Sequence, residues 1–83
     1  MPSATKSGYS WWHFDKVLIK LGWRQIPNHS KGYLTYTNTL NDKIVITKEN
    51  NMNLDYFHKL LRQLGIPPLL FATLASGARR PTK

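Results

Sequence analysis

Two stretches of the chain carry hydrophobic residues at the three- and four-residue spacing of an amphipathic helix. Ser10 and Asn53 precede them and suit helix N-caps, because their side-chain oxygens can accept a hydrogen bond from a free backbone N–H group. A glycine follows each stretch, as expected where a helix ends in the left-handed conformation. The pattern predicts helices over residues 10–21 and 53–64. Their apolar stripes are Trp11, Phe14, Val17, Leu18 and Leu21 in the first, and Leu54, Phe57, Leu60, Leu61 and Leu64 in the second.

Between these helices the chain becomes dense in β-branched and aromatic residues. Residues 32–37 and 43–47 are typical of strands, and the polar residues 38–42 between them favour a turn. A shorter strand at 23–26 precedes them, ending where Pro27 interrupts pairing. The order predicts an α+β fold of the form α-β-β-β-α. We expect a three-stranded antiparallel sheet with both helices on one face, because each element has a single apolar surface to bury.

The remaining segments flank a predicted compact domain over residues 10–66. We expect a disordered N-terminal tail over residues 1–9 and a basic disordered tail over residues 76–83. Residues 67–75 begin with two prolines, which end the preceding helix, and continue as a short apolar extension. That extension either folds back as a short helix that closes the core or presents its large side chains to another chain, including a second copy. Those side chains are Leu70, Phe71 and Leu74.

The length and composition of the chain exclude several kinds of functional site. At 83 residues the chain has the size of one domain, and its lack of cysteine excludes disulfides, thiolate metal sites and cysteine nucleophiles. We expect a cytoplasmic protein without a membrane partner, because no run of eighteen apolar residues and no signal-peptide pattern occurs. The four acidic residues are scattered and no glycine-rich phosphate loop is present. We therefore expect no metal and no cofactor.

The charge of the chain favours a polyanionic partner. Twelve Lys and Arg against four Asp and Glu give a net charge of +8, with an isoelectric point near 10.1. Residues 10–66 hold eight of the basic residues and all four acids, a net charge of +4, and the flanks hold the other four basic residues. A small domain at +4 also fits an ordinary solvated surface. The net charge therefore fits a protein that binds phosphate groups, but the charge alone does not require that function.

Three short motifs resemble the HicA toxin family over about residues 14–66. They are a helix ending in Leu21–Trp23 (Leu-Gly-Trp), a Lys31–Gly32 pair at the start of a strand, and a closing helix Lys59–Ile66 (Lys-Leu-Leu-Arg-Gln-Leu-Gly-Ile). The resemblance lies in their order and separation. It implies a fold similar to the double-stranded-RNA-binding domain and the role of ribonuclease toxin in a bacterial toxin–antitoxin pair.

One departure from the family pattern bears on catalysis. The family follows the Lys-Gly pair with a Ser-His stretch whose histidine is catalytic, whereas Lys31–Gly32 is followed here by Tyr33–Thr35. Leu and Thr side chains cannot take a proton from a ribose 2′-hydroxyl as an imidazole can. We therefore expect RNA binding with weak or no nuclease activity. The alternative is a metal-independent endoribonuclease toxin in which His29, in the loop before this strand, replaces the missing histidine; His13 and His58 are interpreted as half-packed or solvated helix residues.

We predict that the RNA partner meets one basic surface. Its cations are Lys31, Lys43, Lys48, Lys59 and Arg62, and its neutral donors are Asn50 and Asn51 near the start of the second helix. A further alternative is a protein-interaction module, in which an acidic antitoxin-like partner covers the basic face.

Overall fold

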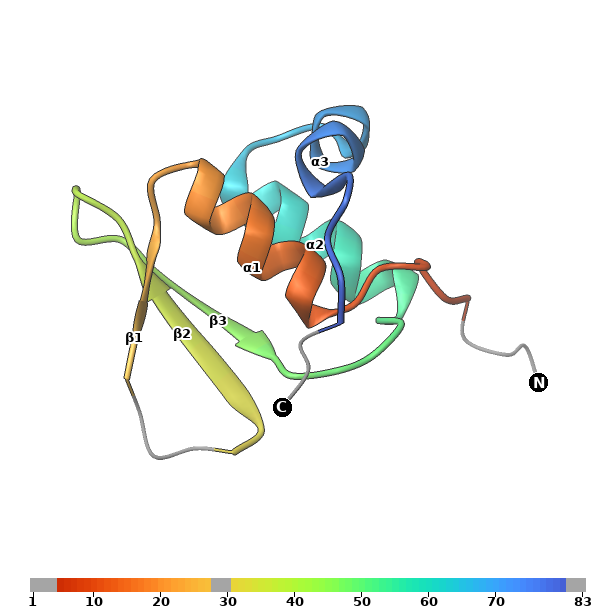
Figure 1. The fold of residues 1–83 in the computed structure, drawn as a ribbon, viewed down its shortest axis with the longest axis horizontal. Helices are drawn as coiled ribbons and strands as arrows, with labels where there is room; N and C mark the ends of the chain where they lie inside the picture. Colours follow the sequence, from red (N-terminus) through yellow and green to blue (C-terminus); the bar gives the residue numbers. More distant parts are fainter. Residues whose placement is uncertain (1–4, 28–30, 81–83) are drawn as a thin grey trace.

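The computed structural model describes residues 5–27 and 31–80, and the account below refers to these residues. Three helices and three strands follow one another along the chain (Figure 1). They are α1 (Trp11–Lys20), β1 (Arg24–Ile26), β2 (Tyr33–Thr37), β3 (Lys43–Thr47), α2 (Leu54–Leu64) and α3 (Pro68–Ala75). The predicted α+β class and α-β-β-β-α order are confirmed, and α3 is added after them.

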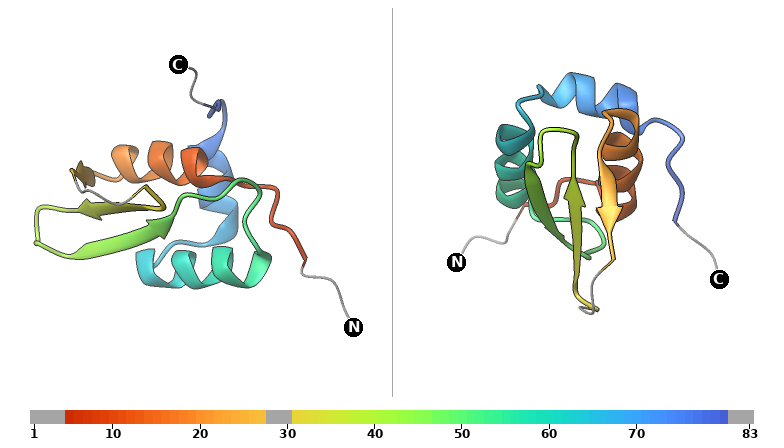
Figure 2. Two further views of the ribbon diagram at one scale, coloured as in Figure 1. Left: turned by 90° about the horizontal axis from the view of Figure 1, so that it is seen from below. Right: turned by 90° about the vertical axis from the view of Figure 1, so that its left-hand side faces the viewer.

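The strands form one antiparallel sheet in the order β1-β2-β3. Both predicted helices lie on the same face of this sheet, and the right-hand view of Figure 2 shows them behind the strands. Alternate side chains of the strands enter the core between the sheet and the helices. These are Leu34 and Tyr36 from β2 and Ile44 and Ile46 from β3. Within residues 5–27 and 31–80 no helix covers the opposite face of the sheet, and we call it the open face.

The residues predicted to begin and end the helices do so. Ser10 is the N-cap of α1, and Asn53 caps α2 by accepting a hydrogen bond at Oδ1 from the backbone N–H of Asp55, 2.8 Å away. Gly22 and Gly65 follow the last turns with φ values of 93° and 72°, a region that disfavours residues with a Cβ. Local chemistry thus fixes both helix lengths before any packing is considered.

Residues 5–9 differ from the predicted disordered tail. They run beside the start of α2, where the N–H of Ser7 donates to the carbonyl of Met52 and the N–H of Met52 donates to the carbonyl of Tyr9, at 2.8 and 2.7 Å. The ring of Tyr9 stacks on Phe57 with 5.1 Å between centroids. Residues 5–9 therefore form part of the folded domain, whereas the sequence predicts a disordered tail over residues 1–9.

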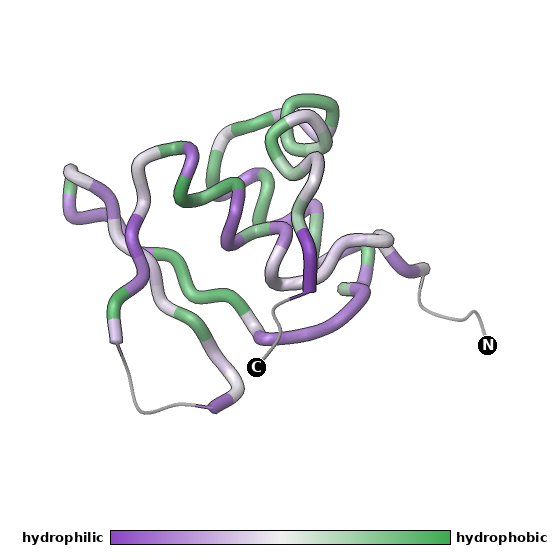
Figure 3. The backbone as a smooth tube through the Cα atoms, in the orientation of Figure 1, coloured by the Kyte–Doolittle hydropathy of each residue, from purple (hydrophilic) through white to green (hydrophobic). Residues whose placement is uncertain are grey.

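Helix α3 closes the core. Phe71 has no exposed surface and Ala75 is buried, and the Phe71 ring lies 4.6 Å from that of Phe14. Of the two alternatives for residues 67–75, folding back is the one observed, and Phe71 is not available to a second chain. Leu69 and Leu70 stay 80% and 41% exposed, because α3 is hydrophobic along most of its length and buries only one side (Figure 3).

The chain that follows α3 contacts the domain over residues 76–78. The Lys16 ammonium donates to the carbonyl of Ser76 at 2.8 Å, and the N–H of Ala78 donates to the carbonyl of Ala75 at 3.0 Å. The tail predicted to be disordered from residue 76 thus begins as a bonded turn. In residues 5–27 and 31–80, none of the helices combines the length and the apolar composition needed to cross a bilayer.

Candidate nucleic-acid interface

The open face presents side chains from all three strands. Strand register places Thr37 between Arg24 and Lys43, and places Thr35 between Ile26 and Val45. The three rows along the face are Arg24–Thr37–Lys43, Ile26–Thr35–Val45 and Tyr33–Thr47. None of the strands contains Asp or Glu. The open face is therefore bordered by cations and free of strand carboxylates.

A hollow of about 410 Å³ lies at the end of this face nearest the β2–β3 turn. Its lining residues are Arg24, Gln25, Ile26, Pro27, Thr37, Asn41 and Lys43. Arg24 and Lys43 are exposed and belong to strands on either side of Thr37. We call this feature the Arg24–Lys43 hollow. Two cations across one central residue, with an amide beside them, are groups that contact phosphate oxygens in protein–nucleic-acid complexes.

The β2–β3 turn keeps the neighbouring carboxylate out of this hollow. The Asn38 Oδ1 atom accepts hydrogen bonds from the N–H groups of Leu40 and Asp42, at 2.9 and 3.0 Å, and so shapes the turn. The Asn38 amide in turn donates to an oxygen of the Asp42 carboxylate at 3.4 Å. Asp42 and Lys43 both line a neighbouring cavity with Trp23, and Asp42 is absent from the Arg24–Lys43 hollow. The positive charge of Lys43 is thus not matched by a carboxylate in the hollow.

Lys31 and Lys48 lie at the other end of the β2–β3 hairpin from Lys43. The N–H of Lys48 donates to the carbonyl of Gly32 at 2.9 Å, which brings this end of the two strands together. The Lys48 ammonium lies 5.1 Å from the centroid of the Trp11 ring, a cation–π contact with helix α1. Lys48 is thus held toward the helices, while Lys31 is exposed where β2 begins.

Asn51, one of the two predicted donors near the start of α2, has structural partners. The Asn51 Oδ1 atom accepts a hydrogen bond from the N–H of Gly8 at 2.9 Å, and the N–H of Asn51 donates to Ser10 Oγ at 2.8 Å. The side chain of Asn53 occupies an N–H group in the first turn of α2. Asn50 is exposed. Asn51 therefore joins the N-terminal segment to the body of the domain, and the helix end offers fewer free donors than the sequence predicts.

The predicted basic surface is divided among three places. Lys43 borders the open face, Lys31 and Lys48 occupy the far end of the hairpin, and Lys59 and Arg62 lie on the exposed side of α2. Helix α2 covers the other face of the sheet, so its two cations do not share the open face with Lys43 (Figure 2). Arg24, which the structure places across from Lys43, is absent from the predicted set.

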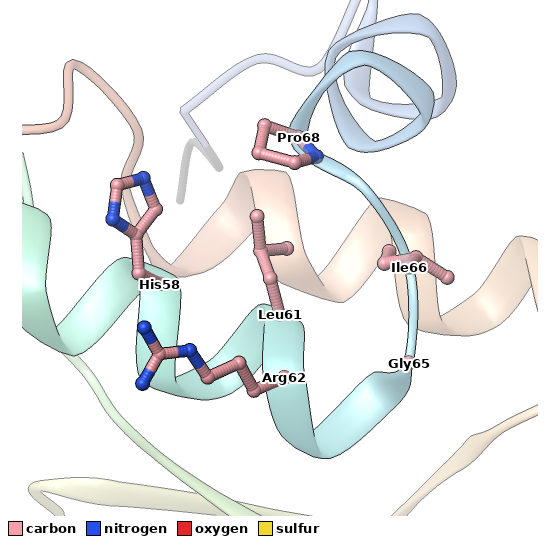
Figure 4. A pocket seen from close by; sticks show the side chains of 6 residues that line it. All are labelled: His58, Leu61, Arg62, Gly65, Ile66 and Pro68. Atoms are coloured by element: carbon pink, nitrogen blue, oxygen red, sulfur yellow. The ribbon is translucent and has the colours of Figure 1, made fainter.

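A second cavity lies between α2 and α3, with a volume of about 410 Å³. Figure 4 shows His58 and Arg62 on the α2 side of this cavity and Ile66 and Pro68 on the side that leads into α3. The buried side chain of Leu61 lies between them. We call it the α2–α3 pocket. Its lining is mainly apolar with two basic side chains at one flank.

The described histidines all lie away from the open face. His29 belongs to residues 28–30, outside the described part of the chain, so its predicted role stays a prediction. Burial lowers the pKa of His13, whose Nδ1 accepts a hydrogen bond from the N–H of Ser10 at 2.9 Å. His58 lines the α2–α3 pocket. Over residues 5–27 and 31–80 no group of three or more His, Cys, Asp or Glu side chains gathers as a metal site would require.

No family model, curated protein or solved structure matches the chain. The resemblance to the HicA toxin family therefore rests on the three short motifs in the sequence.

Proposed function

We propose that this protein binds RNA through the open face of its sheet. In this proposal it is a HicA-like protein, related to the toxin of a bacterial toxin–antitoxin system, with weak or no nuclease activity. The Arg24–Lys43 hollow carries the proposal, because two exposed cations lie on either side of the buried Thr37 and, among the described residues, no carboxylate lines the cavity. The net charge of +8 supports it through long-range attraction of a polyanion.

The test compares two pairs of cations that differ only in their location. Arg24→Gln with Lys43→Gln removes two charges from the hollow, and Lys59→Gln with Arg62→Gln removes two charges from α2. All four residues are exposed, so both double variants should fold. RNA affinity is measured by fluorescence anisotropy over a range of salt concentrations. We expect the hollow variant to bind more weakly and with a shallower salt dependence, and the α2 variant to keep most of the affinity.

Two results would reject the proposal. One is the absence of RNA affinity at low ionic strength, where phosphate contacts are strongest. The other is an equal loss in both double variants, which would mean that only net charge matters and that the hollow is an ordinary solvated surface.

The same proposal expects little RNA cleavage. A metal-independent ribonuclease needs a base for the 2′-hydroxyl and an acid for the leaving oxygen, and the described open face presents neither histidine nor carboxylate. RNA incubated in EDTA with wild type and with His29→Ala should stay intact in both samples. Robust cleavage that disappears in His29→Ala would establish the endoribonuclease alternative instead.

A second candidate function is protein interaction at the α2–α3 pocket. The observation that favours it is an apolar cavity flanked by Arg62 and His58 and lined by Pro68, which the exposed Leu69 and Leu70 follow in the chain. This chemistry suits an acidic partner with apolar anchor residues, as an antitoxin-like protein would be. A small acidic protein encoded beside this one is the partner to test by calorimetry. Leu69→Ser with Leu70→Ser should abolish that binding, whereas Arg24→Gln with Lys43→Gln should spare it.

A further inference from the structure

The open face also bears on which form of RNA binds there. We propose that it binds unpaired RNA in preference to duplex RNA, with one base stacked on Tyr33 and a phosphate in the Arg24–Lys43 hollow. This inference rests on the proposed RNA-binding function. It adds that the bound RNA is unpaired and that Tyr33 contacts a base.

Tyr33 is displayed in the way that a stacking residue requires. It lies in β2 opposite Thr47 and on the open side of the sheet, and 52% of its surface is exposed. Tyr36, three residues later in the same strand, points the other way and is fully buried in the core. Among the described residues, no aromatic ring packs against Tyr33. The exposed half of Tyr33 is therefore available to a nucleobase, whose π-face stacks on aromatic side chains whatever its identity.

The distance between Tyr33 and the hollow suits an extended strand of RNA. Thr37 lies four positions after Tyr33 in β2, which corresponds to about 13 Å along the strand. The intervening row holds Thr35 and Val45, and Val45 is 51% exposed. The surface between the Tyr33 ring and the two cations thus carries small side chains and is partly apolar. A single strand can lay a base on the ring and a phosphate between the cations in one pass.

A duplex cannot use these groups together. Its bases are already stacked on one another, so the face of Tyr33 has no partner, and recognition depends on phosphates and 2′-hydroxyls spread over about 16 base pairs. The cations that would reach such distant phosphates lie on other sides of this domain. Lys59 and Arg62 are on α2, behind the sheet, and Lys48 is held against Trp11. The open face therefore favours RNA whose bases are unpaired.

The experiment uses two labelled RNAs with the full chain, an oligouridylate of about 12 nucleotides and a duplex of about 16 base pairs, at about 50 mM salt. We expect the oligouridylate to bind at least about 10-fold more tightly. Tyr33→Thr removes the ring and introduces a β-branched residue, which suits a strand, and it should weaken oligouridylate binding by about 5- to 100-fold while leaving duplex binding unchanged. Tyr33→Phe keeps the ring and should bind as wild type does. Leu69→Thr, which removes an exposed apolar side chain from α3, should also have no effect.

Amide chemical shifts of the wild type provide a second measurement that needs no variant. Titration with oligouridylate should shift the signals of Tyr33, Thr35 and Val45 more than those of α2. Equal or tighter binding of the duplex, an oligouridylate affinity unchanged in Tyr33→Thr, or shifts confined to α2 would overturn this inference while leaving RNA binding intact. Failure to bind either RNA would instead overturn the proposed function.

Discussion

Replacing Phe71 with alanine tests whether α3 is part of the folding unit or only an appendage. The Phe71 side chain is fully buried, and its ring lies 4.6 Å from that of Phe14, 5.1 Å from that of Phe57 and 5.0 Å from that of Tyr9. Truncation to alanine removes apolar contacts with all three rings and leaves a cavity that they cannot easily fill. Such substitutions cost about 3–5 kcal/mol, whereas a domain of this size is stable by only about 4–12 kcal/mol.

Urea denaturation followed by circular dichroism measures the free energy of unfolding of wild type and variant. We expect Phe71→Ala to lower it by about 3 kcal/mol or more, and to lower the melting temperature by at least about 12 °C. Leu69→Ala is the matched control on the same helix, because Leu69 is 80% exposed and should change stability by no more than about 0.5 kcal/mol. A loss below about 1 kcal/mol in Phe71→Ala would refute the reasoning, since α3 would then contribute little to the core.

Two further predictions concern hydrogen bonds of α1. The pKa of His13 is lowered in the folded protein, chiefly by burial, so the unfolded chain binds more protons as the pH falls through its ordinary value of 6.5. Stability should therefore be fully present above about pH 6.5 and decline below it, and His13→Gln should flatten this part of the pH profile; a profile equal in both proteins would contradict the assignment. The Tyr36 hydroxyl donates to the Asp15 carboxylate at 2.6 Å, and burial with this bond raises the pKa of Tyr36. Tyr36→Phe should cost about 1.5–3 kcal/mol in urea denaturation, and a double-mutant cycle with Asp15→Asn should show coupling rather than additive losses.

The regular elements were predictable because each has its own period and its own end signals. Ser10 and Asn53 begin α1 and α2, and glycines in the left-handed conformation follow both helices. The segment at residues 5–9 was not predictable, because it is short and mostly polar and its partners at residues 51–54 lie more than forty positions away. Nothing in its local pattern distinguishes a paired segment from a free tail.

Helix α3 shows a different limit of the hydrophobic pattern. Residues 68–75 are apolar almost throughout, so no period marks the side that will be buried. The sequence predicts Phe71 and Leu70 equally as core or interface residues. The structure buries the first and leaves the second 41% exposed, because Phe71 fits between the rings contributed by α1 and α2. Which of the two residues is buried is therefore decided by the packing of the whole domain and not by the sequence pattern of α3.

The sequence did not identify the Arg24–Lys43 hollow, because Arg24 and Lys43 come together only through the register of the strands. The sequence predicts the strands that hold Arg24 and Lys43, but the predicted basic surface includes Lys43 without Arg24. A turn over residues 38–42 pairs Thr37 with Lys43, and antiparallel pairing with β1 then brings Arg24 to the other side of Thr37. Those two pairings would have identified the hollow before the structure was known. The loop that holds His29 gives no such register, since no strand pattern covers it.

The division of the cations among separate surfaces determines how steeply RNA binding should depend on salt. Each phosphate contact to a single strand contributes about −0.7 to the slope of log affinity against log salt. Two contacts in the Arg24–Lys43 hollow give a slope of about −1.4, so affinity should fall only about 7-fold between 50 and 200 mM salt. If all eight net charges acted together, the slope would approach about −5.6 and the loss would exceed about 1,000-fold. A measured slope near the smaller value is the one expected for the Arg24–Lys43 hollow, and its loss in Arg24→Gln with Lys43→Gln but not in Lys59→Gln with Arg62→Gln would place the RNA there. A slope near the larger value means that RNA contacts the basic residues of the whole chain.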